Sequence, residues 1–152
     1  MDVEKYLTEA GVRYTSLKHP EAYTAQEVAA EEHVSGDMVA KSVLVHADGK
    51  SVLCVLPASC KIDLGKLAET LEVKKCRLAE EAELGKLFPD MEIGAEPPFG
   101  KPYGLETFVD TRLSQCRTLT FTAGTHRQAI QVAYDDYAAL AEAKVLDFAL
   151  HL

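Results

Sequence analysis

Two apolar segments joined by a two-residue turn constrain this fold more than any other feature of the chain. Residues 39–47 and 51–56 are rich in valine and leucine, and Asp48-Gly49 follows the first of them. An Asp-Gly pair favours the tight turn in which both central residues take positive φ, and that turn joins antiparallel strands. We therefore expect a β-hairpin in the first half of the chain.

Helical patterns surround this hairpin. Apolar spacing or a capping residue predicts helices at 3–10, 24–33, 63–71 and 79–87, and a last helix that is capped by Asp135 or Asp136 and runs through Leu146. Further short strands are expected at 12–17, 106–109, 117–122 and 129–132. Helices and hairpins mix without regular alternation, which predicts an α+β (mixed α/β) domain around a mostly antiparallel or mixed sheet.

Composition narrows the possible partners and compartments. A length of 152 residues suits a single domain over 1–152, and a net charge of −8 argues against a broadly basic nucleic-acid surface, although a local basic patch remains compatible with it. No apolar run reaches the length of a membrane span, and the acidic start is not a signal peptide. Four cysteines and five histidines lack the spacings of zinc sites. We expect a reduced, cytoplasmic protein without a metal or other cofactor.

Lys41 interrupts an apolar face of the expected hairpin. With alternating side chains, Lys41 shares a face with Val39, Val43 and Val45. A lysine is rarely buried without a partner, so it either lines a pocket that receives a phosphate or carbonyl, or extends its ammonium to water from the strand end. The pattern leaves both interpretations open.

Two glycine-containing loops are further candidates. Residues 93–100 combine two glycines with two prolines, which excludes a helix interior and favours a loop whose amides grip a ligand, or a plain connecting turn. Residues 122–127 form a turn that exposes amides to an anion, or is simply solvated. In that turn His126 is a candidate general acid or base. His19, which precedes Pro20, is a weaker candidate in extended backbone.

Several of these motifs occur in an order that resembles a known family. They are Val-Ala-Lys-Ser-Val-Leu-Val at 39–45, Leu-Pro-Ala at 56–58, Asp-Leu-x-Lys-Leu-Ala at 63–68, the glycine-proline loop, and Ala-Gly at 123–124. Together they resemble the YbaK/ProX family of aminoacyl-tRNA deacylases, related to the editing domain of prolyl-tRNA synthetase. The resemblance covers about residues 3–146 and points to a free-standing subgroup.

The resemblance implies a largely antiparallel, barrel-like sheet with flanking helices. It also implies a trans-acting deacylase that hydrolyses the ester of a misacylated tRNA. Because this ester is already activated, its hydrolysis requires no nucleophilic side chain. By the resemblance, Lys41, Gly94 and Ala95 are catalytic. The substrate-binding residues expected with them are His19, Thr24, Pro98, Phe99, Gly100, Ala123, Gly124, Thr125 and His126.

The glycine-proline loop departs from the pattern of many members. Those members carry Gly-Gly-x-Ser-Pro, whereas this chain has Gly-Ala-Glu-Pro-Pro-Phe at 94–99. We expect the second proline and Phe99 to reshape the amino-acid pocket. The expected partners are the aminoacylated acceptor end of a tRNA and an aminoacyl-tRNA synthetase, with no membrane and no DNA. The alternatives are a non-catalytic ligand- or tRNA-binding module that regulates a synthetase, and an unrelated hydrolase that uses His126.

Overall fold

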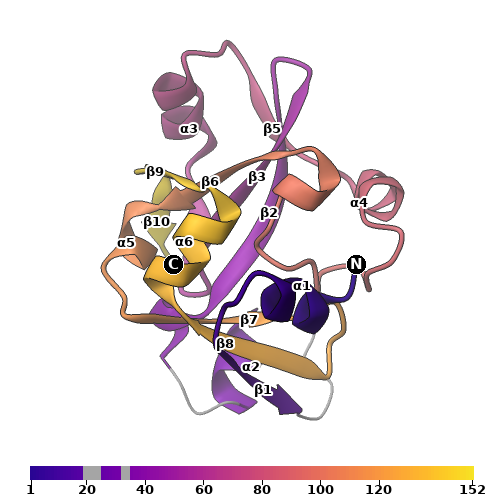
Figure 1. Cartoon of the computed structure of the whole chain (residues 1–152). Coiled ribbons are helices and arrows are strands. Elements are labelled where there is room, and N and C mark those ends of the chain that lie inside the picture. Colours follow the sequence, from indigo (N-terminus) through magenta and orange to yellow (C-terminus); the bar gives the residue numbers. More distant parts are fainter. Residues whose placement is uncertain (19–24, 32–34) are drawn as a thin grey trace.

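The computed structural model describes residues 1–18, 25–31 and 35–152. The predicted residues His19 and Thr24 lie outside these ranges. Within them, the strands form three sheets of five, three and two strands (Figure 1). This mixed α+β architecture confirms the predicted fold class. The described sheets are open and do not form a closed barrel.

The predicted hairpin forms the centre of the five-stranded sheet. Strand β2 (Ala40–Ala47) pairs antiparallel with β3 (Lys50–Pro57), and Asp48 and Gly49 take φ values of 48° and 84° at the turn. Beyond the hairpin, the sheet order is β5-β2-β3-β6-β9. Strand β5 (Cys76–Leu78) pairs antiparallel with β2. On the other side, β6 (Glu106–Asp110) pairs parallel with β3, and β9 (Lys144–Leu146) pairs parallel with β6.

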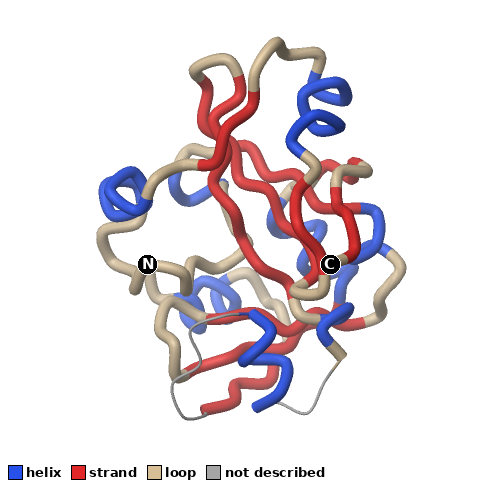
Figure 2. The backbone as a smooth tube through the Cα atoms, turned by 180° about the vertical axis from the view of Figure 1, so that it is seen from behind, coloured by secondary structure: helices blue, strands red, loops and turns tan. Residues whose placement is uncertain are grey.

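The three-stranded sheet lies across one end of the hairpin (Figures 1 and 2). Its antiparallel strands are, in order, β1 (Tyr14–Lys18), β8 (Gln128–Ala133) and β7 (Thr118–Thr122). An isolated parallel bridge between Val39 and Thr120 connects the start of the hairpin to β7. A third, two-stranded sheet pairs β4 (Cys60–Ile62) with β10 (Ala149–His151).

Helices occupy most of the predicted segments. The α-helices of the described residues are α1 (Val3–Glu9), α2 (Ala25–Glu31), α3 (Leu64–Leu71), α4 (Glu81–Leu87), α5 (Thr111–Ser114) and α6 (Tyr134–Ala141); η1 (Gly36–Met38) and η2 (Lys101–Tyr103) are short 3₁₀ turns. The predicted caps of the last helix are wrong. Ala133 caps α6, the backbone turns left-handed at Glu142, and Leu146 belongs to β9. No helix of the described ranges is long and apolar enough to cross a membrane.

The central sheet separates two apolar clusters. On one side, Leu44 and Val55 pack with the aromatic residues Phe99, Phe121 and Tyr137. On the other side, a second cluster joins Val45, Val52 and Cys54 of the hairpin to Leu67, Phe108 and Phe148. This alternation confirms the predicted faces of β2. The glycine-proline loop is therefore rooted in the first cluster, through Phe99.

Candidate functional site

Two left-handed glycine turns lie against each other at one end of the three-stranded sheet, where the chain passes from β7 to β8. Gly94 and Gly124 each have a φ of 88°, a backbone angle that residues with a Cβ atom rarely adopt. The Gly124 amide donates to the Ala95 carbonyl over 2.9 Å, and the Glu92 amide donates to the Gly124 carbonyl over 2.9 Å. These backbone hydrogen bonds bring together three predicted site residues, Gly94, Ala95 and Gly124.

His126 fixes the same junction. It is only 5% exposed, its backbone amide donates to the Glu92 carboxylate over 2.9 Å, and its Nε2 lies 2.7 Å from the Ile93 carbonyl oxygen. A carbonyl only accepts, so Nε2 carries the proton and donates it. In this arrangement Nε2 is not a proton acceptor, and His126 clamps the two loops.

Most amides of the glycine-proline loop are already paired. The Gly94 amide donates to Oε1 of Glu96 over 3.0 Å, so the loop's own carboxylate occupies it. The amides of Ala95, Phe99 and Gly100 donate to Glu92, Pro97 and Thr107. The amide of Glu96 has no acceptor among the described residues. Of the amides in residues 94–100, it is therefore the one that can donate to a ligand without breaking a described hydrogen bond.

The second half of this loop is fixed by contacts with the aromatic core. Phe99 is fully buried, with its ring centroid 5.5, 5.7 and 5.3 Å from those of Tyr6, Phe121 and Tyr137. The Tyr137 hydroxyl donates to the Pro98 carbonyl over 2.9 Å. The described arrangement thus makes Pro98 and Phe99 anchors of the loop.

Gly100 permits a close backbone approach at the end of the loop. A Cβ at this position would lie 2.6 Å from Oγ1 of Thr107 and 2.8 Å from the Leu105 carbonyl oxygen. Both distances are shorter than any carbon contact allows, and the Thr107 hydroxyl accepts the Gly100 amide at 3.0 Å. Gly100 therefore closes the loop onto β6, where Thr107 lies.

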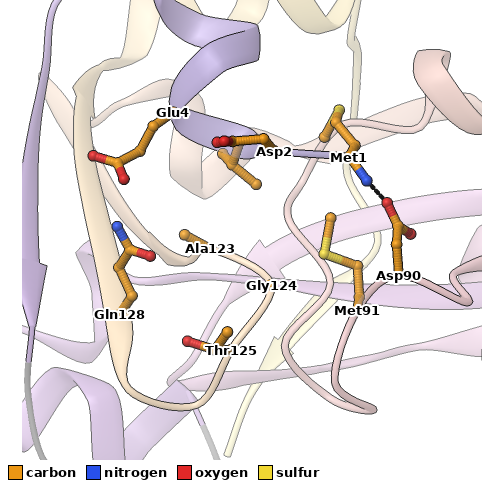
Figure 3. A pocket seen from close by; sticks show the side chains of 10 residues that line it. Met1, Asp2, Glu4, Asp90, Met91, Ala123, Gly124, Thr125 and Gln128 are labelled. Atoms are coloured by element: carbon orange, nitrogen blue, oxygen red, sulfur yellow. Dashed lines mark ion pairs between the residues drawn. The ribbon is translucent and has the colours of Figure 1, made fainter.

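A hollow of about 290 Å³ opens beside the Gly124 turn (Figure 3). Ala123, Gly124 and Thr125 line one wall, and Asp90 and Met91 line another. The φ of 88° at Gly124 disfavours any side chain, and a Cβ would lie 2.5 Å from Sδ of Met91, so the Met91 side chain would have to shift. Three of the predicted substrate-binding residues thus share one hollow.

Lys41 lines a different hollow, also of about 290 Å³, between the hairpin, β4, β5 and α3. Lys41 and Lys61 border it, and its walls are apolar, with Leu56 and Leu78 among them. Burial lowers the pKa of Lys41, and the nearby Cys60 opposes that shift. The structure does not bring Lys41 into the hollow beside Gly124.

Two charged residues near these features did not follow from the sequence patterns. Lys61 follows the hairpin without any motif. For Glu96 a signal was present, since a carboxylate stands within an otherwise apolar loop. No cluster of three or more metal-ligating side chains occurs within the described ranges.

Comparison with known proteins adds the family. The model of the aminoacyl-tRNA editing domain matches residues 19–140. Among solved structures, the hypothetical protein APE2540 superposes with a TM-score of 0.89 at 22% identity, over 99% of this chain and 100% of that one. A protein proposed to be a trans-editing enzyme for prolyl tRNA synthetase superposes with a TM-score of 0.85 at 23% identity, over 97% and 94%. At these identities the structural likeness concerns the fold.

Proposed function

The chain belongs to the family of aminoacyl-tRNA editing domains, and from this membership we propose that it hydrolyses the ester between an incorrect amino acid and the 3′ end of a tRNA. Such an ester is already activated, so its hydrolysis needs a positioned water molecule and support for the oxyanion. Water attacks the carbonyl carbon, the bond to the ribose oxygen breaks, and that oxygen takes up a proton. The products are the free amino acid and uncharged tRNA.

The observation that carries this proposal is the junction of the two glycine turns. The Glu96 amide has no acceptor among the described residues. Its neighbour Ala95 is hydrogen-bonded to Gly124, which lines the hollow. A fixed amide at this position supplies the oxyanion donor, and a hydrolytic site of this kind uses no serine or cysteine nucleophile.

We assign Lys41 to binding of the tRNA end. A half-buried ammonium at the edge of this hollow, with a second lysine on the same border, suits a phosphate of the tRNA end. Lys41→Ala is expected to leave the fold intact and to slow deacylation at subsaturating tRNA by about 10- to 100-fold, because a hydrogen bond between charged groups is worth about 1.5–3 kcal/mol. Lys61→Ala removes a more exposed lysine from the same hollow, and a much smaller effect is expected. Equal rates for Lys41→Ala and the wild type would refute the assignment.

The decisive experiment is a deacylation screen over a panel of correctly and incorrectly charged tRNAs. Because a protein of the same fold is proposed to act in trans beside prolyl tRNA synthetase, mischarged tRNA^Pro is the first member of the panel. Release of the amino acid from at least one mischarged tRNA, faster than from its correctly charged counterpart, is expected. Binding of charged tRNA without turnover of any panel member would contradict hydrolysis and favour a binding module.

A further inference from the structure

Glu96 is a buried carboxylate with an incomplete set of partners. The residue is 5% exposed, and its side chain accepts one hydrogen bond, from the Gly94 amide at 3.0 Å. No lysine, arginine or histidine of the described residues forms an ion pair with it. Buried carboxylates are normally paired with a cation, because an unpaired charge in a poorly hydrated position is costly. Among the described residues this site lacks a cation, and a ligand that carries one would complete it.

The position of Glu96 indicates which ligand group that is. Its neighbour Ala95 accepts the Gly124 amide, so Glu96 lies where the two glycine turns meet. Gly124 lines the hollow of Figure 3, so the segment that carries Glu96 is hydrogen-bonded to one wall of this hollow. Glu96 does not itself line the hollow, but it follows directly after the residue that is bonded to the hollow's wall.

Glu96 also offers an unpaired backbone amide beside its buried carboxylate. An aminoacyl ester carries the complementary pair of groups, since its α-ammonium is attached to the carbon next to the ester carbonyl. The amide suits the carbonyl oxygen, and the carboxylate suits the ammonium. We propose that Glu96 recognises the free α-ammonium of the aminoacyl group and thereby selects aminoacyl esters over N-blocked esters. This inference rests on the proposed function for the identity of the ligand.

The variant Glu96→Gln isolates the charge. A glutamine side-chain oxygen still accepts the Gly94 amide, so the loop keeps its hydrogen bond while the negative charge is lost. Glu92→Gln is the matched control, because it removes an exposed carboxylate two residues before Gly94 and keeps an acceptor for the His126 amide. Far-UV circular dichroism and thermal melts establish that both variants are folded.

The test measures binding of a pair of non-hydrolysable probes by calorimetry or fluorescence. Both are 3′-aminoacylamino-3′-deoxyadenosines, one with a free α-amine and one N-acetylated. They carry the amino acid that is released fastest in the deacylation screen, or alanine if none is released. The wild type and Glu92→Gln should bind the free-amine probe about 10- to 100-fold more tightly, as expected for a charge-assisted hydrogen bond. Glu96→Gln should lose this preference and bind the acetylated probe as the wild type does.

Three outcomes overturn the inference: no preference in the wild type, an unchanged preference in Glu96→Gln, or no binding of the free-amine probe. The last two include the case in which Glu96 serves only to cap the Gly94 turn. Because binding is measured without turnover, absence of hydrolysis in the screen contradicts the proposed function and leaves this test valid. Conversely, the wild type and Glu96→Gln could each hydrolyse N-acetylated and free aminoacyl esters at equal rates. That result would support the proposed hydrolysis and contradict recognition of the α-ammonium by Glu96.

Discussion

Two tyrosines on α6 should respond in opposite directions to the same substitution. The hydroxyl of Tyr137 is fully buried and donates to the Pro98 carbonyl over 2.9 Å. The hydroxyl of Tyr134 is also buried, but it has no partner among the described residues. Burial raises the pKa of both tyrosines, so both hydroxyls stay protonated at neutral pH. Replacing each by phenylalanine removes one oxygen and keeps the ring.

The expected magnitudes follow from these partners. Tyr137→Phe leaves the buried Pro98 carbonyl without its described donor, which should lower the free energy of unfolding by about 1–3 kcal/mol. At about 2–4 °C per kcal/mol for a chain of this size, the melting temperature should fall by roughly 2–12 °C. Tyr134→Phe removes a polar group that is desolvated without compensation, and it should raise the free energy of unfolding by about 1 kcal/mol.

Urea titrations of the wild type and both variants provide the assay. The midpoint should shift down for Tyr137→Phe and up for Tyr134→Phe, with unchanged m-values. Because Pro98 belongs to the glycine-proline loop, Tyr137→Phe should also slow deacylation at temperatures where it is fully folded. Shifts of the same sign in the two variants, or a Tyr137→Phe midpoint equal to that of the wild type, would refute the reasoning.

Two other predictions concern backbone strain and acid stability. Gly124→Ala should lower the free energy of unfolding more than Gly49→Ala does. Both positions have a positive φ that costs a residue with a Cβ about 1–2 kcal/mol, but the new Cβ meets another side chain, Met91, only at Gly124. Equal losses of the two variants in urea titrations would contradict an effect of this contact. Hydrogen bonds, first of all from Arg77, lower the pKa of Glu83 to about 2, below the unfolded value of about 4.3. The stabilisation is therefore complete above about pH 4.5 and is lost as the pH falls toward 2. Glu83→Gln should flatten the pH dependence of the urea midpoint in that window, and an unchanged slope would exclude this ion pair as its cause.

The parts of the fold that sequence patterns predicted are those set by neighbouring residues. The turn at Asp48-Gly49 and the cap at Asp63, whose carboxylate accepts the Lys66 amide, depend on a few adjacent residues. The start of α6 was misassigned because Asp135 and Asp136 are good caps but lie in its first turn. Strand β9 has three residues, too few for an alternation that differs from a continuing helix.

The candidate site was only partly predictable for the same reason. Loop composition identified the turns at Gly94 and Gly124, but their contact depends on hydrogen bonds between segments about 30 residues apart. Period-two alternation correctly gave the face of Lys41. It could not predict that Lys41 would line a hollow, because the other walls of that hollow come from β4, β5 and α3.

The pairing of β1 with β8 determines when the candidate site can be assembled during synthesis. Tyr14 lies opposite Val132, and Thr122, immediately before the Ala123-Gly124 turn, pairs with Ala129 in the same sheet. A nascent chain that ends before β8 has an unpaired β1 and lacks the strand that closes this turn. Contacts of such long sequence separation form slowly, since the loop between them must be ordered first. We therefore expect the pocket to form late in folding, and until β8 emerges the chain presents two unpaired strand edges that chaperones or other chains can bind.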